Sequence, residues 1–321
     1  MQAVRLLVLL LACVVGAPTR AETVYVSNEL DNTISVIDGT SLGLVATIPV
    51  GRRPRGIALS QDRAKLYVAV GDDDRIDVVD LASRKVEDSL PSGEDPELFV
   101  VHPDGRRLFV ANENDNLVSV VDIPEKKIVD EVQVGVEPEG MAVSPDGRLV
   151  VATSETTSML HVIDADTLEL IDNVLVDTRP REAQVSADNK RIWVSSELRG
   201  TVTVVDAATR EEVGRIGFAV QGVPRELVQA VGIRLTRDGT RAFVALGPAN
   251  RVAEVDAKTF QVRRYYLVGQ RVWHVALSPD ERRLYTANGN SSDVSVIDLD
   301  RQDVVKSIAV GRSPWGVVVA P

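Results

Sequence analysis

The sequence has 321 residues, with 47 acidic residues against 36 lysines and arginines and a formal net charge of −11. This balance disfavours nonspecific binding to nucleic acids or anionic membranes, because such binding depends on counterion release by Lys and Arg. The only cysteine is Cys13, so a disulfide within the chain cannot hold the fold together.

The first residues predict a cleavable secretory signal. Arg5 is followed by an apolar stretch from Leu6 to Ala17 and then by a polar segment that ends in Ala21. The stretch is shorter than the roughly 20 apolar residues that span a bilayer. We expect cleavage after Ala21, with Ala17 as the alternative, and a periplasmic mature chain of residues 22–321. Cys13 then leaves with the signal, unless it accepts a lipid.

Removal of the signal takes away two arginines and no acidic residue. The mature chain then carries 34 basic and 47 acidic residues, a net charge of about −13.

One unit recurs along the mature chain. An apolar run that ends in aspartate appears seven times, with spacings of 42, 42, 42, 42, 50 and 42 residues. A turn aspartate repeats with the same period and the same eight-residue insertion. Two independent markers with one period indicate a repeat architecture. The run-end aspartates are Asp38, Asp80, Asp122, Asp164, Asp206, Asp256 and Asp298, and the turn aspartates are Asp62, Asp104, Asp146, Asp188, Asp238 and Asp280.

Each unit contains four short strand signals. In the third unit they cover residues 140–144, 149–153, 160–163 and 170–175, and they are rich in Val and Ile. Four strands in such a period are typical of a propeller blade, which has about 40–45 residues. Hydrogen bonds to the local backbone at turns explain the recurring aspartates, so we assign them no catalytic role.

The two ends of the chain predict how the ring closes. The mature chain begins with a second, a third and a fourth strand, at 24–28, 34–37 and 45–49, and it ends with a lone first strand from Trp315 to Ala320. Seven complete blades form only if this last strand pairs with the first one, which also removes the exposed sheet edges. The sequence therefore predicts an all-β fold: one seven-bladed β-propeller of four-stranded antiparallel blades over residues 22–321.

The units resemble the YVTN-type propeller repeat. The motifs that carry this resemblance are Val-Gly at 134–135, Pro-x-Gly at 138–140, Ser-Pro-Asp-Gly at 144–147, Val-x-Asn at 110–112 and Val-Ile-Asp at 36–38. The resemblance covers essentially the whole mature chain and implies the propeller fold.

The last three units carry a narrower resemblance. Residues 247–252, 268–273 and 313–317, with the insertion inside 218–232, look like secreted bacterial propellers associated with catabolism that depends on pyrroloquinoline quinone (PQQ). This resemblance implies an accessory role, with a quinoprotein dehydrogenase or a cytochrome as partner. It implies no biochemical activity, because the association is one of context.

The funnel at one face of the ring is the candidate site. The segments leading into the first strands, and the loops between second and third strands, are expected to meet there. The position seven residues before each turn aspartate holds Arg55, Glu97, Glu139, Arg181, Val231, Trp273 and, in the closing strand, Trp315. The next position is glycine in four units, but Leu98, Glu182 and His274 in the other three.

Two interpretations of these residues stay open. The tryptophans, with Arg55, Arg181 and Arg271, could hold a planar anionic ligand such as PQQ. Alternatively, the tryptophans pack between blades and the arginines pair with glutamates, namely Glu97, Glu139 and Glu182. Arg225 and Glu226 of the insertion are expected to overhang the same face. We predict no bound cofactor, with PQQ as a conceivable ligand.

The other loops of this face are acidic. They carry Glu29, Asp31, Asp72, Asp73, Asp74, Glu113, Asp115, Glu155 and Glu197. These residues lack the spacing of a calcium-binding loop, so we predict no metal site but a solvated rim that steers a basic partner. By register, His102, His161 and His274 fall on different parts of the fold and cannot converge on one metal.

Three functions remain. The sequence has no Gly-x-Ser-x-Gly elbow, phosphate-binding glycine loop or Cys-x-x-Cys motif, so we assign no catalytic residue and favour a monomeric, non-enzymatic binding protein with a periplasmic partner. The alternative is a lactonase-like hydrolase, as in other seven-bladed propellers that it resembles, with His274, Glu182 and Glu139 as acid–base groups. Single-stranded DNA binding, known among related propellers, is the third, and the negative charge counts against it.

Overall fold

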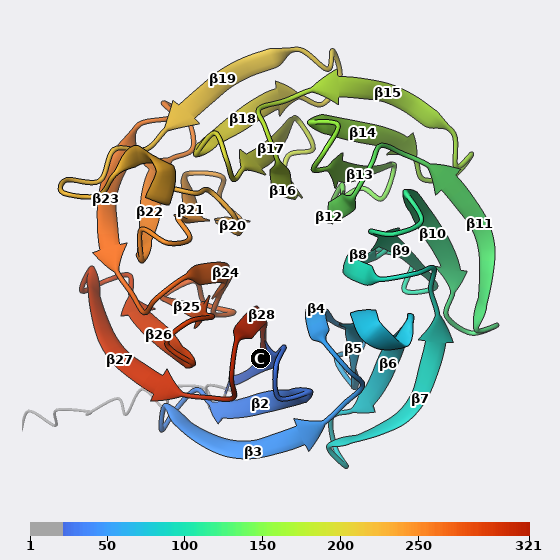
Figure 1. Cartoon of the computed structure of the whole chain (residues 1–321), viewed down its shortest axis with the longest axis horizontal. Helices are drawn as coiled ribbons and strands as arrows, with labels where there is room; N and C mark the ends of the chain where they lie inside the picture. The colour runs from blue at the N-terminus through green and yellow to red at the C-terminus, as the bar shows by residue number, and fades with distance from the viewer. Residues whose placement is uncertain (1–21) are drawn as a thin grey trace, which may run out of the picture.

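The computed structural model of the chain describes residues 22–321. The predicted signal, with both cleavage positions and Cys13, lies outside these residues. Seven four-stranded antiparallel sheets stand as blades around a central axis, as Figure 1 shows. This architecture confirms the predicted fold. Residues 22–321 include no helix long and apolar enough to cross a membrane.

The strands follow the four signals of each unit, and the innermost strand of every blade is given first here. Blade 1 contains β28 (Pro314–Ala320), β1 (Thr23–Asn28), β2 (Thr33–Asp38) and β3 (Gly43–Pro49). Blade 2 contains β4 (Pro54–Leu59), β5 (Lys65–Val70), β6 (Arg75–Asp80) and β7 (Lys85–Pro91). Blade 3 contains β8 (Pro96–Val101), β9 (Arg107–Asn112), β10 (Leu117–Asp122) and β11 (Lys127–Gln133). Blade 4 contains β12 (Pro138–Val143), β13 (Leu149–Ser154), β14 (Met159–Asp164) and β15 (Leu170–Leu175).

The remaining blades repeat this order. Blade 5 contains β16 (Pro180–Val185), β17 (Arg191–Ser196), β18 (Thr201–Asp206) and β19 (Glu212–Gly217). Blade 6 contains β20 (Ile233–Leu235), β21 (Arg241–Ala245), β22 (Arg251–Asp256) and β23 (Val262–Leu267). Blade 7 contains β24 (Val272–Leu277), β25 (Arg283–Asn288), β26 (Asp293–Asp298) and β27 (Asp303–Ala309). Two short 3₁₀ helices interrupt the loops, η1 (Gly71–Asp73) and η2 (Arg225–Leu227).

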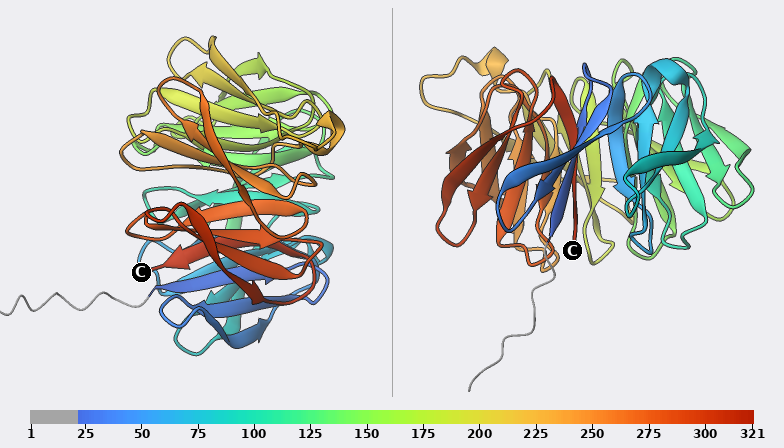
Figure 2. Two further views of the ribbon diagram at one scale, coloured as in Figure 1. Left: turned by 90° about the vertical axis from the view of Figure 1, so that its left-hand side faces the viewer. Right: turned by 90° about the horizontal axis from the view of Figure 1, so that it is seen from below.

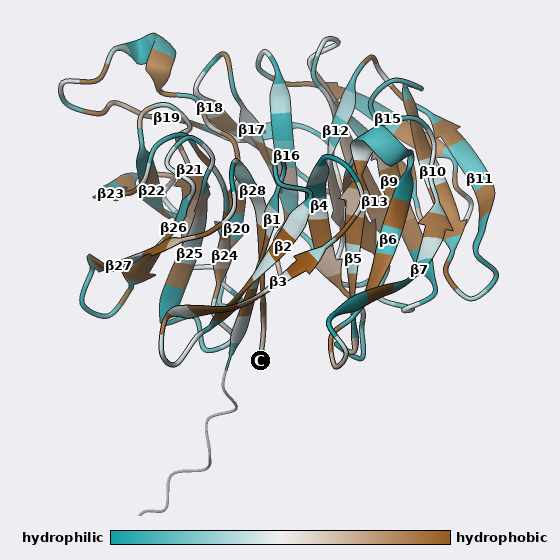
Figure 3. Cartoon of the chain, turned by 60° about the horizontal axis from the view of Figure 1, so that its bottom comes forward, coloured by the Kyte–Doolittle hydropathy of each residue, from teal (hydrophilic) through white to brown (hydrophobic). Residues whose placement is uncertain are grey.

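The core lies between the blades. In blade 4, β13 is buried along almost its whole length, whereas the outer strand β15 is largely exposed. Seven hydrophobic clusters result, and Figure 3 shows apolar strands inside with polar loops at both faces. The sequences of strands that are covered on both faces are nearly continuous runs of Val and Ile, because neither face contacts water.

Blade 1 closes the ring as the sequence predicts. Strand β28 pairs antiparallel with β1, with Val24 opposite Val319 and Val26 opposite Val317. Trp315 is only 1% exposed. The carboxylate of Glu22 accepts hydrogen bonds at 2.5 Å from the Tyr285 hydroxyl and at 3.1 Å from an Arg283 guanidinium nitrogen, which ties the start of the described chain to blade 7.

Glycine recurs in the inner strands because these strands approach one another closely. A Cβ atom on Gly140 would lie 2.1 Å from the carbonyl oxygen of Arg181 in the next blade. On Gly232 it would lie 2.8 Å from Cα of His274 and 3.3 Å from Oε2 of Glu182. The absence of a side chain at residue 232 therefore leaves the space in which Glu182 and His274 approach each other.

Deleting β28 tests the closure. A mature chain that ends at Gly311 loses Trp315 and leaves the edge of β1 unpaired, so we expect it to lose cooperative unfolding in urea, followed by circular dichroism. Trp315→Ala in the full chain should cost about 3–5 kcal/mol, because it leaves a large cavity. A truncated chain as stable as the full mature chain would contradict this closure.

Candidate functional site

Three positions in each blade surround the opening of the funnel, and we call them together the funnel mouth. The first is the residue before the inner strand, and the second is the second residue of that strand. The third is the residue that follows the second strand of the blade. Where a strand is shorter, the residue at the same place in the repeat is taken instead. Their charged members are Glu29, Arg53, Arg55, Asp95, Glu97, Glu113, Glu137, Glu139, Glu155, Arg179, Arg181, Glu197 and Arg271. Figure 2 shows the insertion on the face that carries this mouth and the C-terminus on the opposite face.

The residue before the inner strand has an unusual backbone conformation. In six blades the residue before the inner strand is left-handed without being glycine, with φ between +54° and +58° at Arg53, Asp95, Glu137, Arg179, Arg271 and Ser313. This conformation costs about 1–2 kcal/mol in an L-residue. Its carbonyl group accepts a hydrogen bond from the loop after the second strand, for example from the Glu113 amide to Asp95 at 3.0 Å. The bond holds two mouth positions of one blade together.

The two inner-strand arginines are already paired. Arg55 donates from Nη1 to Glu97 at 2.6 Å and from Nε to Glu29 at 2.9 Å. Arg181, which is 5% exposed, binds Glu139 at 2.8 Å and also contacts Glu155. The pairing interpretation therefore describes both arginines correctly. Burial opposes the charge of Arg181, but the surrounding glutamates outweigh it and raise its pKa.

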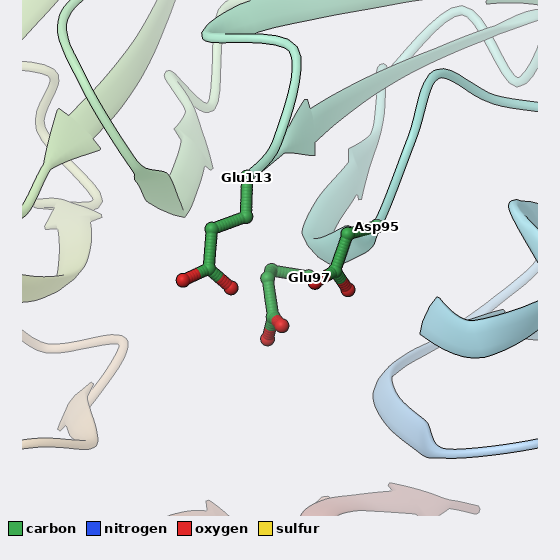
Figure 4. A group of neighbouring side chains, drawn as sticks. All are labelled: Asp95, Glu97 and Glu113. Atoms are coloured by element: carbon green, nitrogen blue, oxygen red, sulfur yellow. The ribbon is translucent and has the colours of Figure 1, made fainter.

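Acids outnumber bases at the mouth, with eight carboxyl groups against five guanidinium groups among the charged members named above. The excess lies on blades 3 and 4. Figure 4 shows Asp95, Glu97 and Glu113 converging, and one oxygen of each lies within 4.8 Å of the others. Burial, the negative charge of Glu97 and a hydrogen bond to it raise the pKa of Glu113 to about 7. Burial also raises the pKa of Glu139 well above its ordinary value, although Arg181 opposes the shift.

The other side of the mouth is aromatic. The ring centre of Trp273 lies 4.0 Å from the guanidinium carbon of Arg271 and 5.5 Å from that of Arg181. Arg271 also reaches across blade 6 to Glu197 at 2.7 Å. Trp315 packs behind, with its ring centre 6.5 Å from that of Trp273. A cavity of about 360 Å³ opens beside these groups, lined by Pro248, Asn250, Gln270, Arg271, Trp273 and Asn290.

Glu182 and His274 lie one position further along their strands. Oε2 of Glu182 is 3.8 Å from Nε2 of His274, whose Nδ1 is 3.1 Å from the carbonyl oxygen of Trp315. Burial lowers the pKa of His274 to about 4, so the ring is neutral at physiological pH. Glu182 pairs with Arg234 and not with the inner-strand arginines, which corrects that part of the pairing interpretation.

The third acid–base residue of the hydrolase hypothesis lies apart from these two. Glu139 binds Arg181 in the mouth, and among residues 22–321 it forms no ion pair or hydrogen bond with Glu182 or His274. The structure therefore assembles a pair, Glu182 with His274, rather than the expected cluster of three.

The insertion rises above the face of the mouth, as Figure 3 shows, and η2 carries Arg225 and Glu226 exposed to solvent. Its chain packs on the outer strand of blade 6, where the Ala219 amide donates to the Tyr265 hydroxyl at 3.1 Å. An open apolar pocket of about 440 Å³ results, lined by Phe218, Ala219, Val220, Gln221, Val223, Arg225 and Val228.

The other two histidines lie away from the mouth, as their register predicts. Nε2 of His102 is 2.7 Å from the carbonyl oxygen of Gly147, in the turns at the opposite face. His161 in β14 bonds to Ser154 at 2.9 Å and to Asn173 at 2.5 Å.

Sequence reasoning missed the residues that precede the inner strands, chiefly Arg53, Asp95, Glu137 and Arg179. A signal was present, because these residues stand two positions before Arg55, Glu97, Glu139 and Arg181 in the same register.

Two families match parts of the chain. The family described as "Cytochrome D1 heme domain" matches residues 66–189, and "Lactonase, 7-bladed beta-propeller" matches residues 173–306. Each match covers less than half of the sequence. The chain is a seven-bladed β-propeller, similar in sequence to these two families. No curated protein matches it.

Solved structures share the fold at low identity. Kuenenia stuttgartiensis hydrazine synthase is 20% identical, with a TM-score of 0.79 over 86% of this chain and 92% of that one. A protein of unknown function from Desulfotomaculum acetoxidans is 14% identical, with a TM-score of 0.78 over 93% and 98% of the two chains. A Lactobacillus plantarum protein is 15% identical, with a TM-score of 0.81 over 94% and 100%. Identities this low indicate the fold alone.

The raised pKa of Glu113 predicts a pH dependence of stability. In the folded chain this carboxyl group keeps its proton up to its pKa of about 7, whereas in the unfolded chain it loses the proton near its ordinary, lower pKa. Between these two pKa values the free energy of unfolding therefore falls as pH rises. Glu113→Gln should therefore be more stable than the native protein at pH 8.5 in the presence of chelator, and about equal at pH 4.

The exposed Glu131→Gln in β11 serves as the control and should show no such difference. Urea unfolding at the two pH values measures both variants. An equal effect of Glu113→Gln at both pH values would contradict the shift.

Proposed function

We propose that this protein is a non-enzymatic binding propeller that docks a positively charged partner on the funnel mouth. The observation that carries the proposal is the excess of carboxyl groups at the mouth, concentrated on blades 3 and 4. Charges of this kind steer an oppositely charged partner and select against wrong ones. The net charge of −11 on the whole chain acts in the same direction.

A small anionic ligand such as PQQ is less well supported. Arg55 and Arg181 would have to exchange their glutamate partners for the carboxylates of the ligand. The remaining carboxyl groups would repel such a ligand, since like charges at short range disfavour binding.

A haem group is not supported by the segment that resembles a haem domain. Residues 66–189 contain His102 and His161, and both rings already have polar partners. His102 also lies at the face opposite the mouth. We therefore derive no chemistry through haem.

The context that we propose is the periplasm, beside a PQQ-dependent oxidation system. The N-terminal signal pattern and the motifs of the last three units support this setting. The partner would be a quinoprotein dehydrogenase or a cytochrome with a basic surface, bound by a monomer of this protein. Nucleic acid is disfavoured by the same negative charge.

Affinity capture from periplasmic extract tests the docking. We expect the mature protein to retain a basic partner, identified by mass spectrometry. The double variant Glu94→Lys/Glu137→Lys, with Glu137 in the mouth and Glu94 next to its member Asp95, should retain at least about ten-fold less of this partner, because it reverses charges that steer and contact it. Added salt should release the partner, because exposed charges are screened.

The control reverses two acids at the opposite face, Glu125→Lys and Asp166→Lys, with the same change in net charge. It should retain the partner. Equal loss from both double variants, or retention by both, would contradict docking at the mouth.

A lactonase-like hydrolase is the second candidate, favoured by one observation. The lactonase family matches residues 173–306, which include Glu182 and His274. A neutral imidazole beside a carboxylate has the character of a general base. Both side chains are almost fully buried, so a substrate would have to enter through the mouth to reach them.

Lactone turnover separates the two candidates. For a binding protein we expect no hydrolysis of a panel of sugar lactones above background, followed by pH change. Turnover that His274→Gln abolishes would establish the hydrolase instead. Glutamine at this position keeps a donor for the Trp315 carbonyl group, and Asn173→Ala, beside the distant His161, is the control.

A further inference from the structure

A fully buried carboxylate oxygen in blade 3 has no role in the pairing described above. Glu97 is 0% exposed, and its Oε1 accepts hydrogen bonds from Arg55 at 2.6 Å and from Arg53 at 3.2 Å. Its second oxygen, Oε2, receives none from any N–H or hydroxyl group of residues 22–321. The hydrogen bond between the Glu97 and Glu113 carboxyl groups lasts only while Glu113 is protonated. Buried polar atoms without a partner are rare, and an ion is one of their regular explanations.

The backbone holds two further carboxyl groups close to Glu97. Asp95, Glu97 and Glu113 each offer one carboxylate oxygen, and these atoms lie within 4.8 Å of one another. As Figure 4 shows, they come from the residue before β8, from β8 itself and from the loop after β9. The left-handed backbone at Asp95 and the hydrogen bond from the Glu113 amide to its carbonyl oxygen hold the two loops in register.

The charges at this place do not balance. The three carboxyl groups have two arginine neighbours. Arg53 pairs with Asp95 and with Oε1 of Glu97, and Arg55 pairs with the same oxygen of Glu97 and with Glu29. The neighbouring acids of blade 4, Glu139 and Glu155, already use Arg181. The nearby arginines therefore do not neutralise all of the carboxyl groups around them. An additional cation would neutralise the negative charge that remains.

We propose that Asp95, Glu97 and Glu113 bind one calcium ion at the funnel mouth. Calcium takes six to eight oxygen ligands in a flexible geometry, and it prefers carboxylates. Three carboxylates supply up to six oxygens, and water from the open mouth completes the shell. Magnesium fits less well, because it requires a near-octahedral shell and keeps most of its water. This inference does not depend on the docking proposed above, because it concerns an ion in the isolated protein.

Isothermal titration of the chelator-treated mature protein with CaCl₂ tests the site. We expect one ion per chain with a dissociation constant of about 0.1–1 mM, the range of extracellular calcium modules. Bound calcium should also raise the unfolding temperature, since an ion that binds only the folded state stabilises it. Absence of heat and of any thermal shift at about 10 mM CaCl₂, far above that range, would overturn the proposal.

Two matched variants decide whether the ion is coordinated locally. Glu113→Gln removes a ligand charge and should weaken binding at least about ten-fold, because affinity follows the number of charged ligands. Glu137→Gln makes the same change of charge at the register position of Asp95 in blade 4 and should leave the affinity within about two-fold.

The thermal shift with calcium should follow the same pattern, persisting in Glu137→Gln and disappearing in Glu113→Gln. Equal weakening by both variants would show attraction to the acidic mouth as a whole, and the assignment to these three residues would then be wrong.

Discussion

The antiparallel pairing of β28 with β1 is the contact on which the rest of the structure depends. It joins the last residues of the chain to the first described ones and converts an open row of sheets into a ring without free edges. It also brings Trp315 to the mouth, within 5.7 Å of the guanidinium carbon of Arg55 and 4.1 Å of the His274 ring centre. Side chains contributed by blades 1, 2 and 7 can meet only because this pairing forms.

Within the ring, electrostatics determines what the mouth can do. Arginines buried among carboxyl groups stay charged and fix their partners, so Arg55 and Arg181 act as internal counterions rather than as free anion receptors. The carboxyl groups named at the mouth outnumber its arginines and leave it with net negative charge. Both proposals, the docking of a basic partner and the binding of calcium, rest on this negative charge.

Register explains which pairings could be foreseen. Arg55 and Glu97 occupy the same position in adjacent blades, 42 residues apart, so their ion pair follows from the repeat alone. The partner of Glu182 could not be foreseen in this way, because Arg234 lies beyond the insertion and two residues past Gly232, the position that matches Glu182. Asp95 was overlooked because it precedes the strand by one residue, and only its left-handed backbone turns it toward Glu97 and Glu113.

The sequence by itself determined the period, the number of blades, the closing strand and the inner-strand residues that surround the funnel. Repeats do this because each unit must bury the same face against its neighbours. Only the tertiary structure decided which carboxyl groups share an arginine, that one oxygen of Glu97 receives no hydrogen bond from an N–H or hydroxyl group of residues 22–321, and that His274 is neutral. These properties depend on distances between blades and on the exclusion of water, which a one-dimensional pattern does not contain.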